Sequence, residues 1–155
     1  MKSLQTVRLM VIGAGNIGRI LLRRFVASGV PAENLAVYDS ALERASAVAS
    51  QFGVKPVSLS EDAIHTANVI LMATPPKSVF DLLAIMSKWF RSGQLLISFA
   101  AAVPLAKLES MLPREVMVVR VMPNAPSLVG QGMNPVAYGD WVTPEGKALV
   151  EAVLA

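Results

Sequence analysis

Residue types that build many reactive centres are scarce in this sequence. Its 155 residues include no cysteine and a single histidine, His65. Disulfides, thiolate metal sites and histidine-cluster metal sites are therefore excluded, and no metal site is expected. A serine hydrolase triad would have to depend on that one histidine, and we interpret His65 as a surface or helix-end residue.

Charge is also sparse, and its small positive excess lies in the first half of the chain. Charged residues make up 16% of the chain, the net charge is +3, and no basic run is interleaved with aromatic residues, as a nucleic-acid interface would require. The longest uncharged stretches, 92–106 and 121–139, are broken by Pro or Gly, whereas a membrane-spanning helix needs about 20 mostly apolar residues. We therefore expect no nucleic-acid partner and no membrane span, and we predict a cytoplasmic protein that binds a small molecule.

Apolar residues, by contrast, are abundant. They make up 54% of the sequence, which excludes a disordered chain, and the length fits one domain. A surface this apolar is expected to face another domain or subunit in part. We therefore predict either a homo-oligomer or a C-terminal domain that is missing from this chain.

Short apolar segments alternate with segments of helical periodicity. The predicted strands are 7–12, 35–38, 55–58, 69–73, 95–99, 116–122 and, at a sheet edge, 135–139. The predicted helices are 16–28, 41–52, a short helix capped by Ser60, 77–90, 105–112 and a last one from 144 onward. This order predicts an α/β fold: a doubly wound, mostly parallel sheet with helices on both faces, as in Rossmann-like NAD(P)-binding domains.

The predicted domain spans residues 1–155. Its last helix, EGKALVEAVLA, is amphipathic and has no capping glycine. We interpret the chain as the N-terminal part of a longer enzyme; the alternative is a natural terminal helix that packs on the sheet.

A glycine motif follows the first predicted strand. Residues 13–18, GAGNIG, form a G-x-G-x-x-G pattern that opens a helix inside a βαβ unit, which is the context that dinucleotide binding requires. In this pattern Gly13 permits the tight turn, Gly15 lets the backbone approach a pyrophosphate, and Gly18 allows close packing of helix on strand. The N–H groups of the helix that begins near Asn16 and Ile17 would face the phosphates. The alternative is a turn that only joins the strand to the helix.

Asp39 ends the second predicted strand, 21 residues after Gly18. A carboxylate there can accept both ribose hydroxyls of NAD and repel the 2′-phosphate of NADP. It could instead cap the following helix, and the neighbouring Ser40 and Arg44 could accept a phosphate. We predict NAD or NADP as cofactor, with NAD slightly preferred.

The carboxyl ends of the later strands complete the predicted crevice, because ligands of doubly wound sheets bind there. The segments ATPPK, at 73–77, SFAAA, at 98–102, and RVMPNAP, at 120–126, follow these strands. Small residues and prolines leave room for a flat nicotinamide ring. Asn124, held between two prolines, is a possible positioning residue; no catalytic acid is evident.

Three segments, VIGAGNIG, ISFAAAVPLAKLE and VRVMPNAPSLVGQGMNPVAYG, together resemble the N-terminal half of pyrroline-5-carboxylate reductases. The resemblance implies NAD(P)-dependent reduction of the C=N bond of 1-pyrroline-5-carboxylate to proline, as in proline biosynthesis. It also implies a phosphate loop at 13–18 and cofactor contacts further along the chain. These contacts are Ala73, Thr74, Pro76, Lys77, Ala100 and Met122.

The sequence departs from that family at three places. After the fourth predicted strand, Thr74 and Pro75 stand where the family has Val-Lys, and the lysine appears later as Lys77. After the second, the segment Tyr38-Asp39-Ser40 replaces an Asn-Arg-Ser-like segment. The family's helical C-terminal domain, which forms the dimer and binds substrate, is absent from this sequence. The isolated chain is therefore expected to be inactive. Two alternatives are a dinucleotide-binding or sensor module without turnover and another Rossmann reductase, such as a deazaflavin-linked NADP oxidoreductase, against which the MPN string argues.

Overall fold

The sheet of this protein has seven strands in the order β3-β2-β1-β4-β5-β6-β7. The computed structural model describes residues 3–122 and 135–155. The strands are β1 (Leu9–Ile12), β2 (Leu35–Tyr38), β3 (Lys55–Pro56), β4 (Val69–Met72), β5 (Leu95–Ser98), β6 (Met117–Val121) and β7 (Val136–Tyr138). All neighbouring pairs are parallel except β6 with β7, which is antiparallel and closes one edge. This arrangement confirms the predicted doubly wound sheet.

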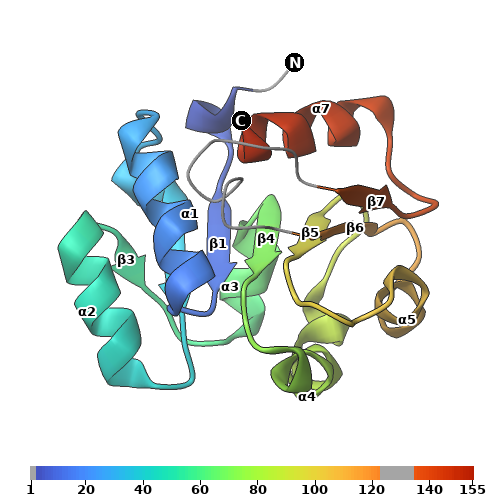
Figure 1. Cartoon of the computed structure of the whole chain (residues 1–155), viewed down its shortest axis with the longest axis horizontal. Helices are drawn as coiled ribbons and strands as arrows, with labels where there is room; N and C mark the ends of the chain where they lie inside the picture. The colour runs from blue at the N-terminus through green and yellow to red at the C-terminus, as the bar shows by residue number, and fades with distance from the viewer. Residues whose placement is uncertain (1–2, 123–134) are drawn as a thin grey trace.

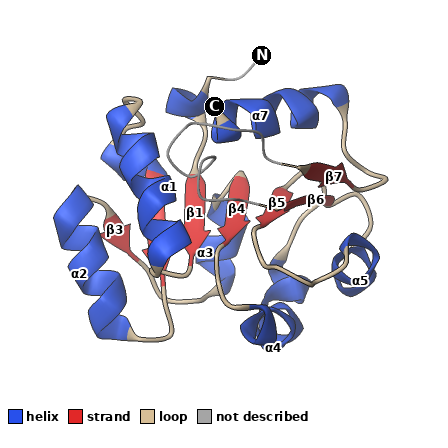
Figure 2. Cartoon of the chain, viewed as in Figure 1, coloured by secondary structure: helices blue, strands red, loops and turns tan. Residues whose placement is uncertain are grey.

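Helices lie on both faces of the sheet (Figures 1 and 2). They are α1 (Asn16–Ala27), α2 (Leu42–Phe52), α3 (Glu61–Thr66), α4 (Pro76–Met86), α5 (Leu105–Met111) and α7 (Pro144–Leu154). Short 3-10 helices lie at Leu4–Thr6, Ala32–Asn34 and Ser87–Trp89. No helix in the two described stretches is long and apolar enough to cross a membrane.

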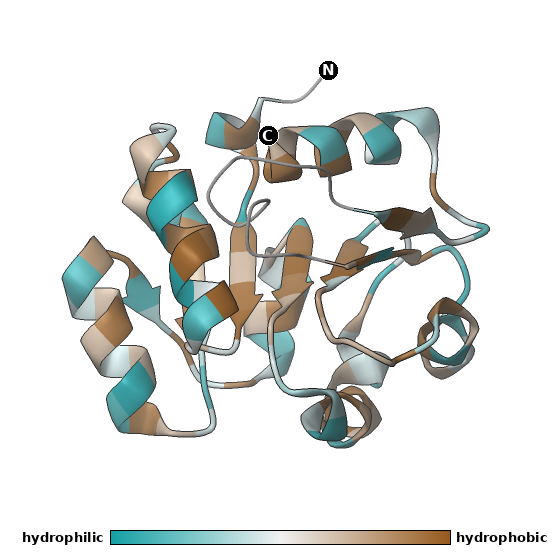
Figure 3. Ribbon diagram, viewed as in Figure 1, coloured by the Kyte–Doolittle hydropathy of each residue, from teal (hydrophilic) through white to brown (hydrophobic). Residues whose placement is uncertain are grey.

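The sheet separates two apolar cores. Side chains of β1, β4, β5 and β6 that point to one face pack with α1, α2 and α7, and those that point to the other pack with α3, α4 and α5. Every residue of β1, β4 and β5 is buried, so the central strands are mostly brown in Figure 3 while β3, at the edge, is teal. Burial on both faces explains why these strands read as continuous apolar runs.

Three predicted boundaries differ from the structure by two residues or more, and the other stated boundaries differ by one residue at most. The first strand begins at Leu9 rather than Val7, since the N–H of Arg8 donates to the side chain of Asn68 (2.8 Å) instead of a strand. The third ends at Pro56 rather than Ser58, and the N–H of Val57 makes one more hydrogen bond to the carbonyl of Val37 in β2 (2.9 Å). The helix predicted to reach Phe90 ends at Met86 and continues as a 3-10 turn, in which the N–H of Phe90 donates to Ser87.

His65 lies in the last turn of α3. Its side chain is partly exposed, and its Nε2 lies 3.8 Å from Glu61 one turn earlier. This confirms the predicted helix-end position. Among the described residues, no three His, Cys, Asp or Glu side chains gather where they could hold a metal ion.

Candidate dinucleotide site

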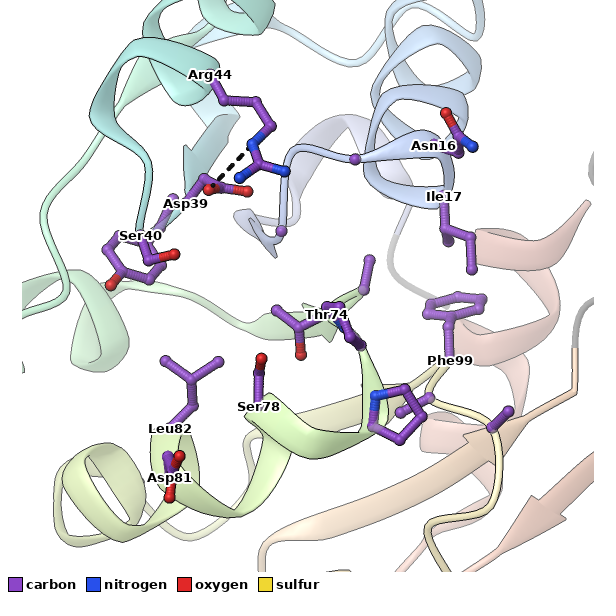
Figure 4. A pocket seen from close by; sticks show the side chains of 18 of the residues that line it. Asn16, Ile17, Asp39, Ser40, Arg44, Thr74, Ser78, Asp81, Leu82 and Phe99 are labelled. Carbon is purple, nitrogen blue, oxygen red and sulfur yellow. Dashed lines mark ion pairs between the residues drawn. The ribbon is translucent and has the colours of Figure 1, made fainter.

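A cavity of about 690 Å³ opens at the carboxyl ends of β1, β2, β4 and β5 (Figure 4). That volume is within the range of small-molecule and cofactor sites. The cavity lies where a doubly wound sheet changes direction, between β1 and β4, which carry crossovers to opposite sides. The lining residues come from the loop after β1, the β2–α2 loop, the β4–α4 loop with the start of α4, the β5–α5 loop and the end of β6.

The glycine loop is fixed to the two neighbouring strands. The N–H of Gly13 donates to the carbonyl of Tyr38 at the end of β2 (2.7 Å), and Gly13 has a φ of 108°. A Cβ on Gly13 would lie 2.5 Å from the carbonyl oxygen of Ala73, after β4. Glycine is therefore required here both by the backbone conformation and by contact with the next strand.

Gly15 and Gly18 serve different purposes. A Cβ on Gly18 would overlap the carbonyl oxygen of Gly13 and lie 3.0 Å from its carbonyl carbon, whereas a Cβ on Gly15 would meet nothing within 4 Å. Gly18 therefore lets α1 lie directly on the loop, behind the cavity. Gly15 lines the cavity itself and leaves open the space in front of the helix.

The first turn of α1 faces this open space. Gly15 is its N-cap, no side chain caps the helix, and the first turn contains no acidic residue. The N–H groups at a helix start have no partner inside the helix, and together with the helix dipole they attract anions. This position could hold a dinucleotide pyrophosphate, because the backbone at the start of the helix is accessible.

Asp39 is held at the end of β2 by three contacts. Its Oδ2 accepts the N–H of Ala14 in the glycine loop (2.8 Å), and its Oδ1 accepts the N–H of Ala41 ahead of α2 (2.8 Å). The Nε of Arg44 lies 3.4 Å from Oδ1, and the Asp39 side chain is 9% exposed against 55% for Arg44. Figure 4 shows this ion pair at one end of the cavity. The carboxylate thus links the loop to α2 while it lines the cavity.

One face of α4 forms the floor of the same end. Ser78, Asp81 and Leu82 line the cavity, and their spacing of three and four residues places them on one face of the helix. Thr74, just ahead of α4, also lines it, and its Oγ1 is buried without a hydrogen-bond partner. Lys77 lies between these positions, is exposed, and does not line the cavity.

The opposite end of the cavity is apolar. Ile17 of α1 and the ring of Phe99 lie close together in Figure 4, and Ala100, Ala101 and Met122 continue this wall. The β5–α5 loop makes its turn at Ala102, where φ is 61°. An aromatic and aliphatic wall of this kind suits a flat heterocyclic ring.

Most residues that the sequence identified as cofactor contacts line this cavity. They are Gly13, Gly15, Asn16, Ile17, Asp39, Ser40, Ala73, Thr74, Pro76, Ala100 and Met122. Gly18 lies behind the loop, where it packs as expected, and Lys77 lies outside. Asn124 lies outside the described residues. Their roles in cofactor binding stay predictions.

Several lining residues were missed from the sequence. Tyr38, Ser78, Asp81, Leu82, Phe99 and Ala101 line the cavity without having been singled out as contacts. Helical spacing predicts that Ser78, Asp81 and Leu82 share one face of a helix, but it does not show that this face meets the crevice. Tyr38 and Phe99 lie at or just after strand ends, and that position could have identified them as lining residues.

Together, the strand order, the glycine loop beneath a helix N-terminus and the acidic residue at the end of β2 define a Rossmann-type dinucleotide-binding domain. The family model described as "NADP oxidoreductase coenzyme F420-dependent" matches residues 8–102, more than half of the chain. The protein belongs to this family.

The named relatives point to one kind of reductase. The chain is 33% identical over 129 residues to a pyrroline-5-carboxylate reductase of Pseudomonas aeruginosa, covering 83% of this chain and 47% of that protein. It superposes on the pyrroline-5-carboxylate reductase of Coxiella burnetii with a TM-score of 0.88 at 24% identity, over 96% of this chain and 56% of that one. The Plasmodium falciparum pyrroline carboxylate reductase, whose structure has NADP bound, gives 0.81 at 25% identity, over 97% and 55%.

The chain spans about half the length of the curated relatives that it matches. The resemblance to pyrroline-5-carboxylate reductases that the sequence motifs indicated is confirmed over this part of their length.

Proposed function

We propose that residues 1–155 form the dinucleotide-binding domain of an enzyme that reduces the C=N bond of a cyclic imine, 1-pyrroline-5-carboxylate, to give proline. The observation that carries this proposal is the cavity at the switch point, because it combines an accessible helix N-terminus, the Asp39 carboxylate and an apolar wall. The names of the relatives support the choice of substrate.

The chain's own residues would bind and orient the cofactor. The backbone around Gly15 and Asn16 would hold the pyrophosphate, Asp39 a ribose, and the Ile17–Phe99 wall the nicotinamide ring. Bound there, the reduced nicotinamide supplies the hydride. Because an imine that arrives protonated needs no strong acid from the protein, the chain's residues would only have to align the two reactants. Asn124 would help to position them.

We propose that NADH binds somewhat more tightly than NADPH. The Asp39 carboxylate is fixed by two backbone N–H groups, so it cannot turn away from a 2′-phosphate. Arg44 offsets part of its charge and would keep NADPH binding measurable. The preference is therefore expected to be modest.

The test is a calorimetric titration of the 155-residue chain with NADH and NADPH in parallel. Both should bind, and NADH should bind up to tenfold more tightly, a difference of about 1.4 kcal/mol. Asp39→Asn should reverse the order. If neither cofactor binds, the proposal that this chain is a dinucleotide-binding domain is refuted. If NADPH binds the native chain more tightly, the proposed contact of Asp39 with the NADH ribose is refuted.

Turnover is expected to need more than this domain. We propose that the substrate side of the site is completed by a C-terminal domain or a second subunit, so that the chain alone binds cofactor, turns over little and tends to self-associate. Turnover of pyrroline-5-carboxylate by the isolated chain would contradict this. A cytoplasmic location remains our expectation from the sequence.

A second candidate follows from the family description, which names coenzyme F420. In this case the domain would bind NADP for hydride exchange with a deazaflavin. Loss of the F420 absorbance of oxidised deazaflavin upon mixing with NADPH and the full-length protein would favour this candidate, and its absence alongside imine reduction would exclude it.

A further inference from the structure

One end of the cavity lies beyond Asp39, between the β2–α2 loop and α4. The pyrophosphate and the nicotinamide ring would occupy the space in front of α1 and the Ile17–Phe99 wall, on the other side of Asp39. In a dinucleotide the second base is bonded to the ribose that Asp39 would contact, and it extends away from the nicotinamide. The end of the cavity beyond Asp39 is therefore the space that remains for this base.

Two surfaces of different chemistry border this space. Arg44 of α2 and Leu82 of α4 both line the cavity, and Figure 4 shows them on opposite sides of it. The Arg44 side chain is held by its ion pair with Asp39 and remains 55% exposed. A guanidinium stacks on aromatic rings, and the half-buried Leu82 supplies apolar surface. Such a pair of surfaces suits the two faces of a flat base.

The edge of the same space is polar. Ser78 and Asp81 line the cavity, and their spacing places them one turn apart on the face of α4 that also carries Leu82. Neither ion pair within the described residues involves the Asp81 carboxylate, although Lys77 lies one turn earlier on the helix. A carboxylate only accepts hydrogen bonds, whereas a hydroxyl both donates and accepts. The edge thus offers one strict acceptor beside one adaptable group.

We propose that this end of the cavity recognises adenine, and that Asp81 accepts a hydrogen bond from its 6-amino group. The inference rests on the proposed function and adds the identity of the base. Adenine carries this amino donor directly beside the acceptor N1, which matches the carboxylate of Asp81 and the hydroxyl of Ser78. Hypoxanthine has a carbonyl oxygen in place of the amino group, so it would lose this bond and bring an acceptor against the carboxylate. Asp81 would then determine the specificity for the base.

The test compares NADH with the reduced form of nicotinamide hypoxanthine dinucleotide. The two probes carry the same charge and differ at one position of the base, so that the ratio of their affinities is insensitive to the net charge of the site. In calorimetric titrations of the 155-residue chain, NADH should bind about tenfold more tightly, as one charge-assisted hydrogen bond would give. Equal binding, or tighter binding of the hypoxanthine probe, would overturn the inference and leave the proposed function intact. If neither probe binds, the proposed function fails first and the inference fails with it.

Three variants identify the residue responsible. In Asp81→Asn the amide can donate to the carbonyl of hypoxanthine, so the preference for NADH should disappear or reverse. Ser78→Ala should weaken both probes alike and keep their ratio, because the hydroxyl donates to N1 of adenine and accepts from the N1–H of hypoxanthine.

Glu151→Gln is the matched control, since it makes the same kind of change at an exposed carboxylate of α7, outside the cavity. It should leave both affinities unchanged. Asp81→Asn and Glu151→Gln should keep the native melting temperature, because both side chains are exposed. A tenfold preference for NADH that persists in Asp81→Asn would overturn the assignment of Asp81.

Discussion

One added methyl group is expected to have opposite effects at two glycines of the loop after β1. In Gly18→Ala, the new Cβ would overlap the carbonyl oxygen of Gly13, a backbone atom that cannot rotate away. In Gly15→Ala, the Cβ would meet nothing within 4 Å, and φ is −84°, which alanine adopts without strain. The first change should damage the fold and the second only the proposed cofactor site.

The magnitudes follow from these contacts. Alanine in place of glycine inside a helix normally gains about 0.5–1 kcal/mol, but overpacking costs about 1–3 kcal/mol or more. Gly18→Ala should therefore lower the free energy of unfolding by about 1–2 kcal/mol, which for a domain of this size lowers the melting temperature by roughly 2–8 °C. Gly15→Ala should leave it unchanged or raise it slightly, because the unfolded chain loses freedom.

The assay pairs thermal unfolding with NADH titration. Gly15→Ala should keep the native melting temperature and bind NADH at least tenfold more weakly, since its methyl group occupies the space in front of the helix N-terminus. Native affinity in Gly15→Ala would refute the placement of the pyrophosphate. Native stability in Gly18→Ala would refute the close approach of α1 to the loop.

Three further changes test other parts of the molecule. Gln94→Leu removes the donors to the carbonyls of Ile64 and Ala67 and the acceptor for the N–H of Arg91. Chemical denaturation should show that the free energy of unfolding falls by about 2–4 kcal/mol. The NADH affinity should stay unchanged, because Gln94 lies before β5, at the end of the strand away from the cavity. Ala102→Gly should raise stability by about 0.5–1 kcal/mol, because φ is 61° there and that conformation costs alanine about 1–2 kcal/mol; Ala101→Gly, without positive φ, should lower it. Asp39→Asn should reverse the preference for NADH over NADPH in parallel titrations. It should also lower the free energy of unfolding somewhat, since an amide cannot accept from both Ala14 and Ala41. An unchanged preference would show that the carboxylate does not contact the ribose.

Much of the cavity lining could be predicted from local sequence features. The G-x-G-x-x-G spacing identified Gly13, Gly15, Asn16 and Ile17, because a glycine loop between a strand and a helix has few other uses. Strand ends identified Asp39 and Ala100 in the same way, since parallel strands bring their carboxyl ends to one edge. Asp39 accepts the N–H of Ala41 ahead of α2 while it lines the cavity, and its role at a ribose stays a prediction.

The sequence alone did not determine which face of each helix meets the crevice. Lys77 and Ser78 are adjacent, yet Lys77 is exposed and Ser78 lines the cavity, because α4 begins at Pro76 and each residue turns the face by about 100°. Likewise, nothing in MVVRV, the sequence of β6, shows that the Nε of Arg120 is buried without a hydrogen-bond partner among the described residues.

By itself, the sequence determined the class of fold, the strand and helix order and the position of the phosphate loop, because these depend on apolar periodicity and on glycine, which are local. The tertiary structure decided which distant residues meet: Asp39 beside Ala14, Gly13 beside Ala73, and Gln94 beside Ile64. These contacts join segments far apart in the chain, and packing of helices against the sheet brings them together.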